Sequence, residues 1–110
     1  MDQQLKTELE LLHDGVCEAL SDPKRIMILY LLADKPLFVN DIASALDLPQ
    51  PTVSRHLKIL RERSLVEATR QANAISYALA DQRIIQALDL MRGILRDRVM
   101  KQARLVDSAS

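Results

Sequence analysis

The stretch Pro49–Val66, PQPTVSRHLKILRERSLV, is the part of the chain around which the fold is organised. Val53, Leu57 and Leu60 follow one another at helical spacing, so they share one face of a short helix that must pack inward. The opposite face is polar and basic, and it carries Gln50, Ser54, Arg55 and Lys58.

That polar face has the chemistry of nucleic-acid recognition, because Gln pairs with adenine edges, Arg with guanine edges, and Lys with phosphates. Just upstream, Asn40–Leu48 has the pattern of another short helix, with Asn40 as its N-cap. A turn at residues 47–49 joins the helices, and we expect Pro49 and Pro51 to stiffen it. A tight turn between two short helices, the later one polar outside, is typical of a helix-turn-helix over 40–63.

The rest of the chain predicts three more helices and a hairpin. Ser21-Asp22-Pro23 is a helix start signal, with capping side chains before Pro at the first helical position. Alternating apolar residues predict two strands with a turn near residues 71–73, which would form a wing. The expected elements are helices over 3–20, 23–34 and 82–105, the last capped by Asp81 with a frayed tail from Val106, and the wing over 65–80.

Composition places the chain in an ordinary class. Its 110 residues fit a single domain over 1–110, and 48% apolar with 27% charged residues is usual for a globular protein. Aromatic residues make up 3%, so we expect an aliphatic core. No apolar run reaches membrane-span length and no signal peptide is evident, so we expect a cytoplasmic location and no membrane partner.

Charge is polarised although the formal net charge is zero. Residues 1–20 are acidic, whereas 50–70 and 83–104 are basic. The terminal helices therefore have opposite charge, and each has an apolar stripe without an evident partner in the chain, which predicts a homodimer. The predicted interface residues are Leu5, Leu9, Leu12, Val16, Leu88, Met91, Leu95 and Val99.

Residues 21–26 (SDPKRI), 51–60 (PTVSRHLKIL) and 77–79 (YAL) resemble the ArsR/SmtB family of bacterial winged helix-turn-helix repressors, and the resemblance covers about residues 5–105. It implies a mainly α fold with a β-hairpin, homodimeric through the terminal helices. It also implies double-stranded DNA as partner, read as a near-palindrome with half-sites about one turn apart.

The expected DNA contacts lie on the recognition helix and the wing: Gln50, Pro51, Thr52, Ser54, Arg55, Lys58, Arg61, Arg70, Gln71 and Asn73. We expect His56 to pack or hydrogen-bond at the turn rather than to read bases. The family commonly has Gly where Ala72 stands and Arg where Asn73 stands, so we expect a less tightly turned wing with weaker phosphate contact.

The family's metal sites do not match this sequence. One site needs a Cys-x-Cys pair, where this chain has Phe38 and Asn40. The other uses Asp, His, His and Glu or His, and its positions hold Asp81, Arg83, Ile94 and Asp97, of which Arg and Ile cannot ligate a cation. We therefore expect no metal and no cofactor.

Cys17 is the single cysteine, which excludes an internal disulfide, and His13 precedes it at i, i+4. That spacing would suit a sensor thiol or a metal ligand pair. A packed, inert thiol is the favoured interpretation, because cysteine is among the most buried residue types. The inducer stays open: a small organic ligand, oxidation at Cys17, a metal at a new site, or none.

Other function classes are weaker. Winged helices also serve as protein-docking modules, and a reduced wing would favour that alternative, but the basic recognition face argues against it. An enzyme is disfavoured, because His13, His56 and Cys17 form no nucleophile–base arrangement and the sequence has no Gly-rich phosphate loop.

Overall fold

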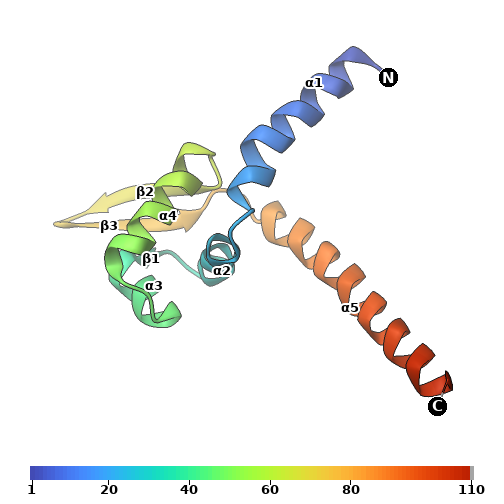
Figure 1. Ribbon diagram of the computed structural model, residues 1–110. Coiled ribbons are helices and arrows are strands. Elements are labelled where there is room, and N and C mark those ends of the chain that lie inside the picture. The colour runs from blue at the N-terminus through green and yellow to red at the C-terminus, as the bar shows by residue number, and fades with distance from the viewer. Residues whose placement is uncertain (110) are drawn as a thin grey trace.

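The computed structural model describes residues 1–109 as a winged-helix body from which two helical arms project (Figure 1). One arm is α1 with the π-helix that continues it, and the other is α5. The element order is α1 (Gln3–Leu11), η1 (Leu12–Cys17), α2 (Pro23–Leu32), β1 (Leu37–Phe38), α3 (Val39–Leu46), α4 (Gln50–Glu62), β2 (Val66–Gln71), β3 (Ala74–Leu79) and α5 (Arg83–Ala109).

The core of the body forms where α2, α3 and α4 meet. The predicted inner face of α4 is confirmed, because Val53, Leu57 and Leu60 are all completely buried. They pack in one cluster with Ile28 and Leu29 of α2, among others. This aliphatic cluster fixes α4 with its polar face outward, which is the orientation that the sequence pattern predicts.

The helix starts follow local rules in α2 and depart from the prediction in α3. Asp22 accepts a hydrogen bond from the backbone N–H of Lys24 at 2.8 Å, the expected cap. The prediction that Asn40 caps α3 is wrong, since the helix begins at Val39 and its N-cap, Phe38, makes no side-chain bond. The reason is tertiary: Phe38 is held extended as part of a strand.

That strand, β1, is an element that the sequence pattern did not indicate. It has two residues, too few for apolar alternation to be visible, and it exists because β3 pairs with it. The sheet order is β1-β3-β2, with Leu37 opposite Tyr77 and Val66 opposite Leu79. Tyr77 therefore lies in the central strand, with Ala68 as its neighbour in β2.

The wing is more tightly turned than expected. Gln71 pairs with Ala74, so only Ala72 and Asn73 form the turn, and pairing continues along both strands. The backbone accommodates this with a φ of 53° at Ala72, a conformation that Gly adopts more easily. The apolar alternation that predicts the second strand does not correspond to burial at Ile75, which is exposed, while its neighbour Ser76 is buried.

The two arms differ in length and regularity from the prediction. The first helix is helical over 3–19 but contains the π-helical stretch η1, which includes Gly15, instead of a continuous α-helix over 3–20. The helix predicted over 23–34 ends at Leu32. The last helix starts after Asp81 as expected, but it continues to Ala109, so the predicted end at 105 and frayed tail are wrong.

Within residues 1–109, no helix combines the length and the apolar character needed to cross a membrane.

Candidate nucleic-acid interface

The outer face of α4 presents an open row of polar side chains. Gln50, Arg55, Lys58 and Arg61 are exposed, and Ser54 is half-buried. Within the described residues, the cations of this row form no salt bridge with a carboxylate. Charge that is not neutralised inside the protomer is available to phosphates.

His56 faces the body rather than this row, as expected. Its Nδ1 lies 3.3 Å from Nη1 of Arg25, and its Nε2 lies 3.9 Å from Oδ2 of Asp22. Burial lowers the pKa of His56, and the nearby Asp22 carboxylate opposes that shift. His56 thus ties the recognition helix to the start of α2.

Two arginines that sequence reasoning did not single out hold α4 and α2 to the first helix. Arg25 donates from Nε to the carbonyl of Ala19 at 2.6 Å. Arg63, at the end of α4, donates to the carbonyl of Asp14 and, at 3.3 Å, to Oε2 of Glu18. Their basic character alone gives no signal of this role, because the main partners are backbone carbonyls, which every residue has.

The wing places its predicted contact residues in solvent. Arg70, Gln71 and Asn73 are all exposed, and the hairpin extends from the body on the side of α4 (Figure 1). The structure thus brings the outer face of α4 and the wing together as two projecting parts of one surface.

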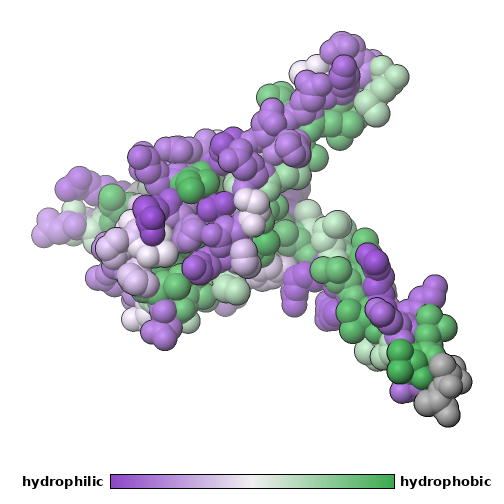
Figure 2. Space-filling model, in the orientation of Figure 1, coloured by the Kyte–Doolittle hydropathy of each residue, from purple (hydrophilic) through white to green (hydrophobic). Residues whose placement is uncertain are grey.

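A separate, apolar groove lies where the two arms leave the body. It has a volume of about 670 Å³, and Leu12, Val16 and Cys17 line it from the first helix while Leu88 and Met91 line it from α5. Figure 2 shows hydrophobic surface along both arms, and Leu95 and Val99 continue it along α5 as exposed residues.

Cys17 is exposed in the protomer, so the expectation of a packed thiol is wrong for the single chain. The cysteine lines the groove instead of packing in the core, because it lies on the first helical arm, which projects from the body. His13 is also exposed, its Nδ1 lies 3.1 Å from Oδ1 of Asp14, and within the described residues it forms no hydrogen bond with Cys17.

At the positions of the family's second metal site, two of the residues form an ion pair with each other. Arg83 donates three side-chain bonds of 2.7 to 3.1 Å to the Asp81 carboxylate. These bonds, and the Arg83 backbone N–H, hold the pKa of Asp81 at about 2. Ile94 and Asp97 lie farther along α5, and no three His, Cys, Asp or Glu side chains of the described chain gather around a common point.

The helix-turn-helix of α3 and α4, followed by a paired β-hairpin and flanked by helical arms, defines a winged helix-turn-helix protein. Residues 22–68 match the model of the family described as "Bacterial regulatory protein, arsR family". The chain belongs to this family of helix-turn-helix transcriptional regulators.

Two similar proteins document that membership. The HTH-type transcriptional regulator NmtR of Mycobacterium tuberculosis is 42% identical over 72 residues, which are 66% of this chain and 60% of NmtR. An uncharacterized HTH-type transcriptional regulator of Methanocaldococcus jannaschii is 36% identical over 77 residues, 69% of this chain and 86% of that protein.

Among solved structures, the homodimeric winged helix-turn-helix DNA-binding domain of Mb0332 from Mycobacterium bovis, a possible ArsR-family regulator, is similar with a TM-score of 0.77 and 26% identity. The likeness covers 90% of this chain and 91% of that domain.

Proposed function

We propose that residues 1–110 form a single DNA-binding domain that works as a homodimeric, sequence-specific transcriptional repressor. Each protomer would insert α4 into a major groove, and the dimer would read a near-palindrome with half-sites about one helical turn apart. The observation that carries the proposal is the exposed row Gln50, Arg55, Lys58 and Arg61, whose cations have no acidic partner in the described protomer.

Dimerisation would use the two arms. The groove between them is apolar, α5 exposes a long apolar stripe, and the arms carry opposite charge. A second copy supplies both an apolar face and the complementary charge, and the similar Mb0332 domain is homodimeric. A dimer bound over a promoter would repress its own or a neighbouring operon by blocking polymerase.

Two substitutions separate base reading from phosphate binding. Arg55 lies in the second turn of α4, where residues meet base edges, and its replacement by Ala should cost about 1–3 kcal/mol per half-site on the operator. Lys58 lies nearly one turn farther on. Lys58→Ala should weaken binding to all DNA alike, and it should flatten the salt dependence by about one unit for each phosphate that the side chain no longer neutralises.

The measurement is binding to the DNA upstream of the protein's own gene and to scrambled DNA, across a salt series. If Lys58→Ala lost affinity only for the operator and Arg55→Ala lost affinity equally for both DNAs, the two assigned roles would be reversed. Failure of the wild-type chain to bind any DNA would favour the alternative, a protein-docking winged helix.

A further inference from the structure

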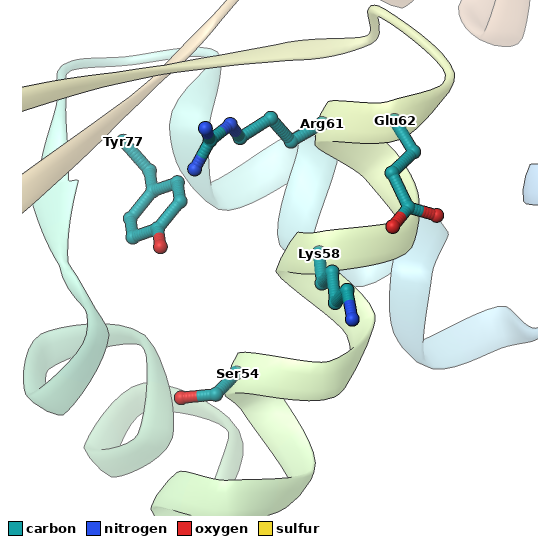
Figure 3. Close-up of a pocket in the computed structure, with 5 residues that line it drawn as sticks. All are labelled: Ser54, Lys58, Arg61, Glu62 and Tyr77. Atoms are coloured by element: carbon teal, nitrogen blue, oxygen red, sulfur yellow. The ribbon is translucent and has the colours of Figure 1, made fainter.

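A trough runs between α4 and the wing, and the sequence pattern did not indicate it. One part, of about 340 Å³, is lined by Ser54, Lys58, Arg61 and Tyr77, with Glu62 at its margin (Figure 3). The other part, of about 350 Å³, shares Ser54 and Tyr77 and reaches Asn40, Gln50 and Asn73.

Beside apolar residues, the trough contains several hydrogen-bonding groups that have no partner within the described residues. Within the described residues, no hydrogen bond engages the side chains of Ser54, Arg61, Tyr77 or Asn40. In Figure 3 the Arg61 guanidinium and the Tyr77 ring lie on the same side of α4, and the Ser54 hydroxyl points to that side. Glu62 also lines this part, but it lies on the opposite side of α4 from Tyr77, so the side that Tyr77 faces carries Arg61 and the neutral Ser54.

Tyr77 is built to hold its hydroxyl in place. It belongs to the central strand β3, paired on both sides with Leu37 and Ala68. Its half-buried ring packs against the hydrophobic core, so ring packing fixes the direction of the hydroxyl. A rigid aromatic ring with a polar tip loses little conformational entropy on binding a ligand.

The geometry of the DNA duplex indicates which part of it would fit in this trough. A helix fits the major groove, about 12 Å wide. The wing projects from the body on the side of α4, so a sugar–phosphate strand that borders this groove would pass between α4 and the wing. Phosphate oxygens accept hydrogen bonds from hydroxyl, amide and guanidinium donors, and such contacts set the register of the protein on the duplex.

We infer that this trough seats one sugar–phosphate strand of the operator, and that the Tyr77 hydroxyl donates a hydrogen bond to one of its phosphates. Arg61 contributes charge at the α4 end, and Asn40 donates from the start of α3 at the other end. The inference rests on the proposed function, because it names the DNA strand and the residues that the same surface uses.

Tyr77→Phe and Arg61→Gln test the inference by their different salt dependences. Tyr77→Phe removes only the hydroxyl, and we expect binding to operator and scrambled DNA to weaken alike, roughly three- to tenfold per half-site. Its salt slope should stay at the wild-type value, because a neutral hydroxyl releases no counterion. Arg61→Gln should lower the slope by about 0.9 for each phosphate that the guanidinium neutralises, while the charge-matched control Lys35→Gln, at an exposed position outside α4, the wing and both arms, should not.

Operators with single methylphosphonate substitutions locate the phosphate. At one position in each half-site, the neutral linkage should abolish the difference between wild type and Tyr77→Phe. Asn40→Ala, at an exposed side chain without internal bonds, gives a second result that does not depend on the folding of the sheet, and it should show the same unselective loss.

Wild-type affinity of both Tyr77→Phe and Asn40→Ala for both DNAs would overturn the inference, and so would a Tyr77→Phe loss that persists on every methylphosphonate operator. Strong wild-type binding in those experiments would leave the proposed function standing. Failure of the wild type to bind any DNA would overturn the proposed function itself, so the two failures are distinguishable.

Discussion

His56 shows how one side chain links the recognition helix to the body. The Nδ1 atom of the neutral ring lies 3.3 Å from Nη1 of Arg25, and it can accept a hydrogen bond from that group only when Nδ1 carries no proton. The groups facing it are Asp22, Lys24 and Arg25 from the start of α2 and Arg55 from its own helix. Three of these four are cations, so protonation adds positive charge to a mainly positive, partly buried place.

We predict that stability falls as the pH drops below about 6.5, the ordinary pKa of His. The pKa of His56 is lowered in the folded state, so the unfolded chain binds the proton more tightly. The stabilisation is fully present above the pKa of His56 in the unfolded chain, and it is lost as the pH falls through the lower pKa of the folded state. The measurement is the denaturation midpoint between pH 7.5 and 5.5, with His56→Gln as the control whose amide oxygen can still accept from Arg25. Equal slopes in both proteins would contradict the prediction.

Cys17 gives a second residue-level prediction, because its accessibility reports on the groove. It is exposed in the single chain and lines the surface that a second copy would cover. We expect slow alkylation by iodoacetamide in the wild-type dimer and much faster alkylation in a monomeric variant such as Leu95→Glu. Equal rates in the two proteins would place Cys17 outside the interface.

Among the elements, α5 has two parts with different roles. Its first part packs against the body of the same protomer, and its later part is available to pair with a second copy. Near its start it is held to α2, because Tyr30 donates to Asp89 at 2.6 Å and the Arg92 guanidinium lies 5.1 Å from the Tyr30 ring centroid. Beyond that point its apolar side chains are exposed, and Leu95 is 58% exposed. A substitution at Leu95 therefore tests association without disturbing the core.

We predict that Leu95→Glu raises the dimer dissociation constant by more than about tenfold, because each protomer would bury an unpaired carboxylate at about 1–3 kcal/mol. Gln86→Glu adds the same charge at an exposed position off the stripe of the same helix, and it should leave the dimer intact. Sedimentation equilibrium measures both. A wild-type monomer at micromolar concentration would contradict the premise of pairing.

The long first helix illustrates what an element's pattern leaves undetermined. Its apolar stripe predicts a helix, and the residues are helical, but the π-helical stretch at Leu12–Cys17 interrupts the α-helical register. Arg63 donates to the Asp14 carbonyl inside that stretch. This contact with the end of α4 is tertiary, and no 3.6-residue periodicity carries information about it.

For the molecule as a whole, we predict that zinc does not release the operator. Arg83 already occupies the Asp81 carboxylate as an internal cation, and the resemblance to the family gives Phe38, Asn40 and Ile94 at other ligand positions. Titration of the protein–operator complex with zinc should leave the affinity unchanged. The double variant Arg83→His with Ile94→His restores the two histidines that the resemblance implies beside the carboxylates Asp81 and Asp97, and it should gain zinc binding. Release of the wild type by stoichiometric zinc would show a site that uses other ligands.

Local sequence patterns were enough to predict the helical body and the outward face of α4. Val53, Leu57 and Leu60 are spaced so that burying them leaves Arg55 and Lys58 in solvent, whatever the rest of the chain does. The cap of α2 and the start of α5 were equally predictable, because capping depends on neighbours within a few residues. These features are local, so a one-dimensional pattern contains them.

Features that join distant parts of the chain came from long-range packing instead. Strand β1 exists because β3 pairs with it, and that pairing moves the start of α3 to Val39, leaving Asn40 free to line the trough. Tyr77 has an ordinary strand pattern, and its place beside Arg61 appears only when the hairpin packs against α4. Cys17 is of a residue type that is often buried, but it is exposed because it lies on the first helical arm, which projects from the body. In each case the partner lies far away in sequence, and the packing energy of that contact, rather than local propensity, sets the outcome.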